Sequence, residues 1–265
     1  GKSIYQIGET FGSYDLISSY VNHGQLDAQF NFNLFFTARN TFLSPESPLT
    51  VVHDEMQKTF QVYGMNHRMG NLMDSHDQIR YIALADGDLK LDSPDAQEIA
   101  WNNPPRVDSL QSYSKAELFM AYMLTIPGIP VIYYGDEIGM TGSSDPDNRR
   151  MMRFGAELIQ PEQTMRERIS RLCAVRRENP ALTRGDFYTV AVDHNDWAYL
   201  RSCPDQRVLV VLNKGSESKS LELNVPDFYQ ASQAVDLTGR STLSIRDHKI
   251  RVDLPPYGYG IYRLK

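Results

Sequence analysis

The sequence contains little cysteine: Cys173 and Cys203 are the only two among 265 residues. Two isolated thiols cannot build the disulfide framework of a small secreted domain, and neither belongs to a metal-binding motif. Cys173 falls within a helical pattern and is interpreted as a buried packing residue. Cysteine usage therefore does not indicate the redox compartment.

Long hydrophobic runs and concentrated positive charge are also absent. No segment approaches the ~18 consecutive apolar residues that a membrane-spanning helix requires, so we expect no membrane span. Asp and Glu outnumber Lys and Arg by 33 to 27, and the formal net charge is −6. Because the basic residues form no stripe along the sequence, we also expect no nucleic-acid partner.

The sequence has no internal repeat, no low-complexity tract and no methionine at its start. Gly1 is followed almost at once by a strand-like run at residues 3–8. We therefore expect the chain to be a piece of a longer protein. Any signal peptide would lie upstream, so localisation stays open, and a periplasmic or secreted parent is compatible with this.

Residues 1–182 alternate short strands with helices, a pattern typical of βα units. We expect strands at 3–8, 26–32, 71–74 and 129–134, and helices at 15–21, 49–63, 114–125 and 162–178. Long polar loops at 75–110 and 139–150 follow the third and fourth strands. Four such units are half of a (β/α)₈ barrel, in which active sites lie where the strands end.

The pattern changes after Asn179 and Pro180. Short strand-like runs separated by turn residues predict an antiparallel β domain, a β-sandwich, over residues 183–265. The predicted strands are 187–192, 198–202, 208–213, 220–223, 231–236, 243–245, 249–253 and 259–264.

Carboxylates and a histidine stand where two of the barrel strands end. Glu9 follows the first strand, and His76 and Asp77 follow the third. A structural interpretation is a helix-cap partner for Glu9 and a hydrogen-bonded turn for the pair. The functional interpretation is a general acid at Glu9 and a sugar-hydroxyl site at His76 and Asp77, since Asp accepts and His can donate hydrogen bonds.

The loops after the third and fourth strands hold further candidates. A structural ion pair at the barrel rim is the favoured interpretation of Glu137. Asp145 and Arg149 are either solvated charges of a turn or part of a site. Trp101 either stacks on a sugar or anchors its loop. The remaining histidines show no zinc-ligand spacing, so no metal site is expected.

Five motifs together resemble the α-amylase superfamily of glycoside hydrolases, near its neopullulanase and cyclomaltodextrinase members. They cover about residues 1–180, and the β-rich tail fits the family's C-terminal domain. The motifs are IGET (7–10), LDAQFNF (26–32), MDSHD (73–77), GIPVIYYGDE (128–137) and DPDNRR (145–150). The resemblance implies an α/β fold, the C-terminal half of a (β/α)₈ barrel with its strands five to eight.

The resemblance also implies roles for single residues. Glu9 would be the acid/base, and Asp77 would hold the 2- and 3-hydroxyls of the distorted sugar and stabilise the transition state. His76 would bind the same sugar, and Asp145 and Arg149 would contact a glucose further along the chain. The family usually has Asn where Ser75 stands, a departure expected to weaken a local hydrogen bond. The substrate would be an α-glucan or a maltooligosaccharide.

One part of the family's machinery has no counterpart here. The family's nucleophile lies on barrel strand four, in a Gly-x-Arg-x-Asp motif upstream of the acid/base, and only eight residues precede Glu9. The resemblance thus implies a fragment that lacks the nucleophile and is inactive alone. Its partner would be the N-terminal half of the barrel. This segment would need no cofactor, although calcium would be possible in that other half.

Other interpretations remain. If the chain takes no part in catalysis, it is a carbohydrate-binding fragment, a structural fragment or a relative that binds another protein. Glu9, His76 and Asp77 together argue against a pure scaffold, which does not need them. Within enzymes, a parent that transfers glucosyl groups competes with a hydrolase, because the two differ in water access at the acceptor side.

Overall fold

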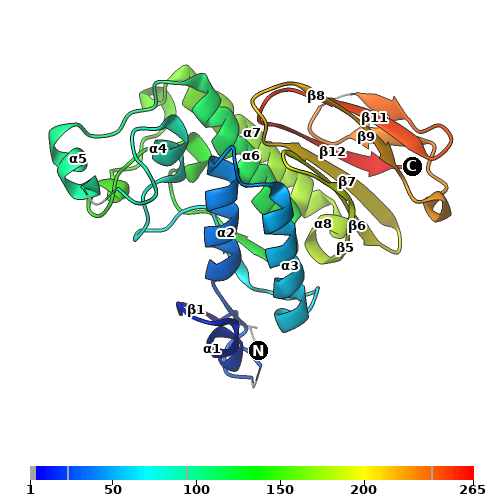
Figure 1. Ribbon diagram of the computed structural model, residues 1–265, viewed down its shortest axis with the longest axis horizontal. Helices are drawn as coiled ribbons and strands as arrows, with labels where there is room; N and C mark the ends of the chain where they lie inside the picture. The colour runs from blue at the N-terminus through cyan, green and yellow to red at the C-terminus, as the bar shows by residue number, and fades with distance from the viewer. Residues whose placement is uncertain (1–3, 23, 94, 240) are drawn as a thin grey trace.

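The structure is a computed structural model that describes residues 4–265 except 23, 94 and 240. Its first part alternates strands and helices (Figure 1). The elements are β1 (Ile7–Gly8), α1 (Tyr14–Ser19), β2 (Ala28–Gln29), α2 (Phe32–Leu43), α3 (Leu49–Tyr63), β3 (Gly70–Leu72), α4 (Tyr81–Asp86), α5 (Ala96–Asn102), α6 (Leu110–Thr125), β4 (Ile129–Val131), α7 (Gln160–Glu178) and α8 (Pro180–Arg184). The first strand is shorter than predicted, and position 3 of that prediction lies outside the described residues.

The four short strands form a parallel series in chain order. β1 pairs with β2, and β3 pairs with β4, each in parallel. A parallel bridge between Phe30 and Gly70 joins the two pairs. Gly70 permits this approach, because a Cβ there would lie 2.7 Å from Ile7 Cδ1. All four strands therefore end at the same edge, and in the described part of the chain β1 and β4 each have a strand partner on one side only.

The helix α2 was not predicted. The alternation at 26–32 indicates one strand, but the strand ends at Gln29 and the helix begins at Phe32. Residues buried from this helix include Phe35, Ala38 and Phe42, at helical spacings of three and four. The aromatic residues at its start favour strands in isolation, and packing on both sides of the helix overrides that preference.

The segment 75–110 is not the simple polar loop that was predicted. It contains α4, in which every residue from Tyr81 to Ala85 is buried, and α5. Both helices are too short for a periodic pattern to emerge in a polar context. The segment therefore carries packed structure next to the strand ends.

Each of the eight strands predicted after residue 183 has a counterpart. They are β5 (Asp186–Val192), β6 (Asp196–Cys203), β7 (Gln206–Asn213), β8 (Lys219–Asn224), β9 (Gln233–Asp236), β10 (Thr242–Ser244), β11 (Lys249–Leu254) and β12 (Gly258–Leu264). A six-stranded antiparallel sheet has the order β10-β9-β12-β7-β6-β5, and a two-stranded sheet pairs β8 with β11. The C-terminal part is thus an antiparallel sheet domain.

The six-stranded sheet is covered on both faces, because side chains alternate along its strands. Ala198 and Leu200 of β6 belong to the core shared with β8 and β11. Trp197 and Tyr199 of the same strand belong to the large core shared with the helices. The sheet therefore packs directly on the helical layer, as Figure 1 shows.

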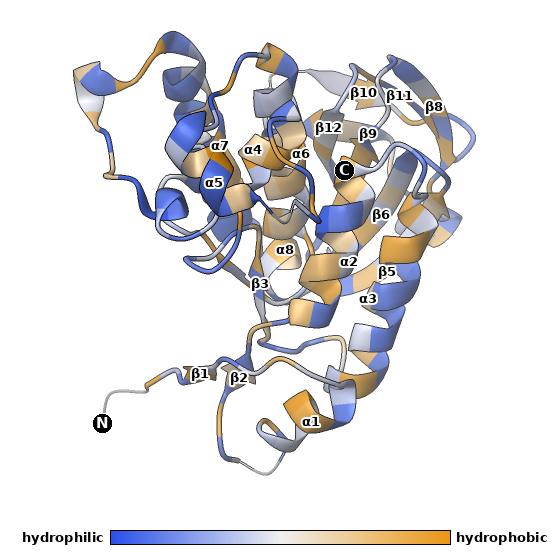
Figure 2. Ribbon diagram, turned by 60° about the vertical axis from the view of Figure 1, so that its left-hand side comes forward, coloured by the Kyte–Doolittle hydropathy of each residue, from blue (hydrophilic) through white to orange (hydrophobic). Residues whose placement is uncertain are grey.

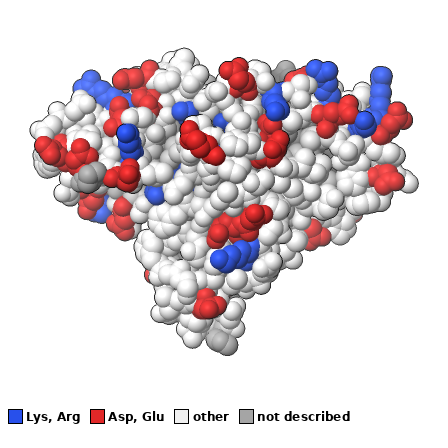
Figure 3. Space-filling model, viewed as in Figure 1, with Lys and Arg blue, Asp and Glu red and all other residues white. Residues whose placement is uncertain are grey.

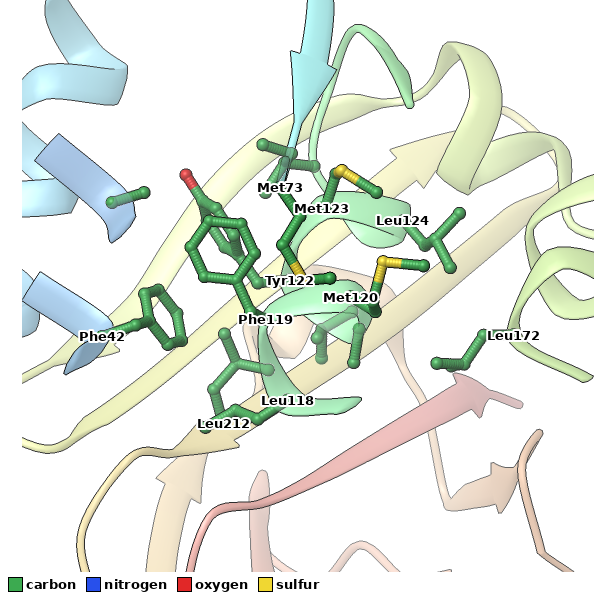
Figure 4. Close-up of a cluster of buried hydrophobic side chains, with 14 of the residues drawn as sticks. Phe42, Met73, Leu118, Phe119, Met120, Tyr122, Met123, Leu124, Leu172 and Leu212 are labelled. Carbon is green, nitrogen blue, oxygen red and sulfur yellow. The ribbon is translucent and has the colours of Figure 1, made fainter. Parts of the chain in front are cut away.

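The helix α6 lies at the centre of the large core. Every residue from Ala116 to Thr125 is buried. Its side chains meet Phe42 of α2, Leu172 of α7 and Leu212 of β7 in different directions (Figure 4). The colouring by hydropathy shows the same helix as largely apolar, whereas α3 carries polar residues on its outer side (Figure 2). Both parts of the fold thus share this one helix.

We expect Phe119→Ala to destabilise the fold strongly. The Phe119 ring is 1% exposed and lies 4.9–5.7 Å, between centroids, from the rings of Phe42, Tyr81 and Tyr122. Truncation should lower the free energy of unfolding by about 3–5 kcal/mol, measured by urea denaturation followed by circular dichroism. The control is Phe228→Ala, at a 74% exposed ring, which should change it by no more than about 0.5 kcal/mol. Equal effects of the two substitutions would contradict the central role of α6.

Candidate active site

Glu9 is placed immediately after β1, at the carboxyl end of the parallel strands. Its side chain is exposed, and it accepts no hydrogen bond from the described residues. The residue before it is tightly surrounded, since a Cβ on Gly8 would lie 2.7 Å from the side-chain ends of Leu26 and Gln29, which would have to shift. The close pairing of β1 with the second strand segment therefore fixes where the Glu9 backbone leaves the sheet.

Four of the predicted site residues come together at this edge. Arg149 Nη2 lies 3.4 Å from Asp77 Oδ1 and 3.1 Å from Asp145 Oδ2. His76 Nε2 lies 3.4 Å from the same Asp77 oxygen. All four side chains are between 42% and 54% exposed, so these ion pairs contribute little to stability. They leave polar groups facing solvent, where a polyhydroxyl ligand can exchange with them.

Main-chain contacts hold the His76–Asp77 turn in place. Asn148 Nδ2 donates to the carbonyl oxygens of His76 and Gln78 at 2.7 and 2.9 Å, and Arg149 Nε donates to the His76 oxygen at 3.1 Å. The Ser75 hydroxyl accepts from the Asp77 amide at 3.2 Å. Serine at this position thus keeps a local hydrogen bond to the turn.

A buried ion pair lies beneath this turn. Arg80 Nη1 lies 2.9 Å from Asp136 Oδ1, and both side chains are fully buried. Arg80 Nε also donates to the Asn148 carbonyl at 2.9 Å, and its guanidinium lies 4.1 Å from the centre of the Tyr133 ring. The pair therefore joins the segment after β3 to the segment after β4.

The expected ion pair of Glu137 is not found among the described residues. Glu137 Oε2 accepts a hydrogen bond from the Gly135 amide at 2.8 Å, and its neighbour Asp136 forms the ion pair instead. The two neighbouring carboxylates point to different sides of a short 3₁₀ turn at Asp136–Ile138. Sequence alone does not say which of the two faces the interior.

Asp74, just after β3, shares the buried environment of Asp136. Asp74 accepts from the Tyr81 amide at 2.8 Å. Burial raises the pKa of Asp74 to about 6, against the lowering effect of the Tyr81 amide and of Arg80. Burial and the adjacent Asp74 carboxylate raise the pKa of Asp136 well above its ordinary value, although Arg80 opposes this. Arg80 thus faces two interacting carboxyl groups, and Arg39 adds a further positive charge near Asp74.

Trp101 does not anchor its loop, so the structural interpretation of this residue is wrong. The side chain is 78% exposed on α5. Gln97, one helical turn earlier on the same face, donates from Nε2 to the Asp145 carbonyl at 3.1 Å. The helix therefore holds an exposed indole on the side of the loop that carries Asp145.

Arg80 and Asn148 are the positioning residues that sequence reasoning missed. Their partners are 56 to 72 residues away in the chain, so no local pattern marks them. The one available signal was their position inside or next to the MDSHD and DPDNRR motifs. Both are fully buried, which distinguishes them from the exposed residues they support.

The described residues contain neither a metal cluster nor a membrane-spanning helix. Within the described residues, no three His, Cys, Asp or Glu side chains gather as metal ligands would. No described helix has the length and apolar character to cross a bilayer. On the face drawn in Figure 3, basic side chains are interspersed with acidic ones.

Comparison with known families agrees with the geometry of this edge. Residues 2–181 match the family described as "Alpha amylase, catalytic domain", and residues 188–261 match "Maltogenic Amylase, C-terminal domain". The chain belongs to the α-amylase family. The expected resemblance is thereby confirmed, and the α-amylase catalytic domain and the C-terminal sheet domain are both present.

Curated relatives of this α-amylase family member have modest identity. A cyclomaltodextrinase of Geobacillus thermopakistaniensis is 27% identical over 99% of this chain and 40% of its own length. Neopullulanase 2 of Thermoactinomyces vulgaris is 28% identical over 91% of this chain and 37% of its own length. The chain thus spans about two fifths of the curated relatives it matches.

Solved structures show the same fold. The Anoxybacillus α-amylase superimposes with a TM-score of 0.81 at 23% identity, covering 98% of this chain and 52% of that one. The α-amylase of Geobacillus thermoleovorans, solved with acarbose, gives a TM-score of 0.80 at 24% identity, covering 98% and 53%.

The Asp74 carboxyl should make stability depend on pH. Its pKa is about 6 when folded and near 3.8 when unfolded, so the folded state holds the proton more tightly. The resulting stabilisation is present below about pH 4 and is lost as the pH rises through about 6. Asp74→Asn removes this loss. As the pH rises from 4 to 7, the free energy of unfolding of the variant should therefore increase by on the order of 2 kcal/mol relative to that of the unmodified chain.

Urea denaturation at several pH values between 4 and 7 measures this difference. The control is Asp205→Asn, at an exposed carboxyl in the turn between β6 and β7. It should follow the unmodified chain at every pH. If Asp74→Asn does so too, the proposed proton uptake is wrong.

Proposed function

We propose that this chain supplies the acid/base and a sugar-binding part of the active site of a retaining glycoside hydrolase that acts on α-1,4-glucans or maltooligosaccharides. The observation that carries the proposal is the convergence of His76, Asp77, Asp145 and Arg149 at the strand edge where Glu9 also stands. Membership of the α-amylase family supports it. So do relatives named cyclomaltodextrinase and neopullulanase, and related structures whose descriptions name acarbose, maltotriose and maltose as ligands.

In this proposal Glu9 acts first as a general acid. Its carboxyl protonates the glycosidic oxygen as the bond to the sugar breaks, and its carboxylate then takes a proton from the attacking water. An exposed carboxyl is accessible for this exchange. The apolar or anionic surround that favours a general acid would be completed by substrate and by protein outside the described residues.

Asp77 and His76 hold the reacting sugar. The Asp77 carboxylate accepts hydrogen bonds from two adjacent sugar hydroxyls, which strengthen as positive charge develops on the ring. Arg149 is shared between Asp77 and Asp145, so it orients both carboxylates. Asp145 and Arg149 then contact a neighbouring glucose, and the exposed Trp101 offers its ring face to a sugar further out.

The nucleophile is a separate carboxylate in this proposal. A retaining mechanism needs one about 5–5.5 Å from the acid, in line behind the reacting carbon. Asp77 is engaged with Arg149 and His76 and is assigned to hydroxyl binding. The free edge of β1, next to Glu9, is where a further parallel strand would bring the nucleophile. We therefore propose that residues 1–182 are barrel strands five to eight with their helices, that 183–265 form the second domain, and that the other half of the barrel completes the site.

Glucosyl transfer is a second candidate for the reaction. A cyclomaltodextrin glucanotransferase of Geobacillus stearothermophilus is 38% identical over 104 residues, 39% of this chain. Hydrolysis and transfer share the glycosyl intermediate and differ in whether water or a sugar hydroxyl attacks it. Product analysis at high maltooligosaccharide concentration separates the two.

The chain alone should show no turnover of maltooligosaccharides, because the acid lacks its partner carboxylate. Reducing-end assays with maltoheptaose, on chain purified from a host without amylase, measure this. Calorimetry with the same sugar tests whether the His76–Asp77 site still binds. Robust hydrolysis by the chain would contradict the assignment of the nucleophile. If the longer protein also binds the sugar but does not hydrolyse it, a non-catalytic sugar-binding role would be favoured.

In the longer protein, Glu9→Gln should lower kcat by about 10²–10⁴-fold, the contribution typical of general acid–base catalysis. KM should change little, since glutamine keeps the shape of the side chain. The matched control is Glu178→Gln, whose side chain is 67% exposed at the end of α7. Steady-state kinetics on maltotriose measures kcat and KM separately. A higher KM with an unchanged kcat would contradict the acid/base role.

A further inference from the structure

Two buried arginines meet at the carboxyl end of α6. Arg176 of α7 donates to the carbonyls of Leu124, Ile126 and Gly128 at 2.6–3.2 Å. Arg201 of β6 donates to the carbonyls of Thr125, Leu182 and Gly185. Every one of these acceptors is an uncharged main-chain oxygen.

The negative charge that a salt bridge would supply is absent here within the described residues. Neither arginine forms an ion pair there, and Arg201 is 1% exposed. The end of a helix supplies only about half a negative charge, against two full positive charges. Burial lowers the pKa of Arg201 to about 9, and the nearby Arg176 adds to this, while Tyr199 and the Asp186 carboxylate oppose it. Buried charge without a partner is costly, so an anion at this place would be favourable.

A cavity of about 480 Å³ opens against Arg201. It lies at the amino ends of β3 and β4, the opposite end of the strands from Glu9 and Asp77. Arg68 and Arg184 stand at its rim, and His67, Asn66 and Thr183 add polar groups. Its lining includes no Asp or Glu, although acidic residues outnumber basic ones in the chain as a whole.

We propose that this cavity binds a small phosphate-type oxyanion, either free or as the phosphoryl group of a sugar phosphate. Guanidinium groups match the oxygens of phosphate with paired hydrogen bonds, and those of Arg68 and Arg184 stand exposed at the rim. Arg201 already donates to main-chain oxygens and adds positive charge beneath the cavity. Phosphate carries more than one negative charge near pH 7, about 1.5 to 2 for a phosphoryl group, which suits several arginines better than a single carboxylate would. Burial and Arg201 lower the pKa of His67 to about 4, so its ring is neutral and contributes a hydrogen-bond donor. The site is separate from the proposed sugar site and does not depend on it.

Calorimetry with inorganic phosphate at pH 7, with sodium chloride holding the ionic strength constant, tests the proposal. We expect saturable binding to the unmodified chain. The double variant Arg68→Gln/Arg184→Gln should bind at least about tenfold more weakly, since it removes charged hydrogen bonds. Both side chains are exposed at the rim, so the fold should survive, and circular dichroism checks this. Arg68→Lys/Arg184→Lys keeps the charge and should bind with intermediate affinity.

The matched control is Arg177→Gln/Arg251→Gln, which makes the same change in net charge at side chains that are 80% and 74% exposed elsewhere. It should bind phosphate as the unmodified chain does. Glucose 1-phosphate, with glucose as the uncharged comparison, separates the two sources: tighter binding than phosphate identifies a sugar phosphate, and equal binding identifies the free anion. No saturable binding of either, or equal losses in the rim variant and the control, overturns the proposal.

Discussion

The constraint on which the rest of this structure depends is that α6 has no solvent-facing side over its last three turns. Its apolar side chains need cover in every direction, and α2, α7 and β7 provide it from far-apart parts of the chain. Its polar groups need partners as well. Glu117 receives hydrogen bonds from Arg168 and Tyr259, and the final carbonyls receive them from Arg176 and Arg201. These partners come from both the helical layer and the sheet. The contacts and hydrogen bonds that α6 requires therefore hold the two layers against each other.

The candidate sugar site is supported by a buried group of charges at its own end of the strands, the carboxyl end. Exposed ion pairs such as Arg149–Asp77 hold little energy and shift easily, so they do not define a geometry alone. The buried Arg80–Asp136 pair does, because leaving either charge without its partner would be strongly destabilising. Arg80 also binds the Asn148 carbonyl, and the Asn148 amide binds the His76 carbonyl. Rigid support therefore lies one layer beneath flexible contact groups, an arrangement suited to a ligand that offers many interchangeable hydroxyls.

The sequence predicts α3 with the ends it has in the structure, since Val52, Met56 and Phe60 recur at helical spacing and Gly64 follows. It also predicts each C-terminal strand, with ends that differ by at most two residues, because alternation and turn residues are local signals. The helix α2 was not predicted, because the aromatic residues at its start are typical of a strand. At the site, motif order places His76, Asp77, Asp145 and Arg149 together, and the structure agrees with that. The Arg80 network could not be predicted, because ion pairs between distant segments exist only once the fold brings them together.

Glu9, the proposed acid/base, is only partly defined by the described residues. Its backbone position is well determined, since β1 pairs with β2 and the side chains of Leu26 and Gln29 pack closely against Gly8. Its surroundings are not, because one edge of β1 carries no strand in the described residues and the carboxyl is exposed. A general acid differs from any other surface carboxyl in what encloses it, not in where its backbone lies. By contrast, Asp77 already has its turn, its arginine and its buried support within this chain. The proposed sugar-binding part of the site is thus defined within this chain, whereas the proposed acid/base lies exposed beside the edge of β1 that carries no strand in the described residues.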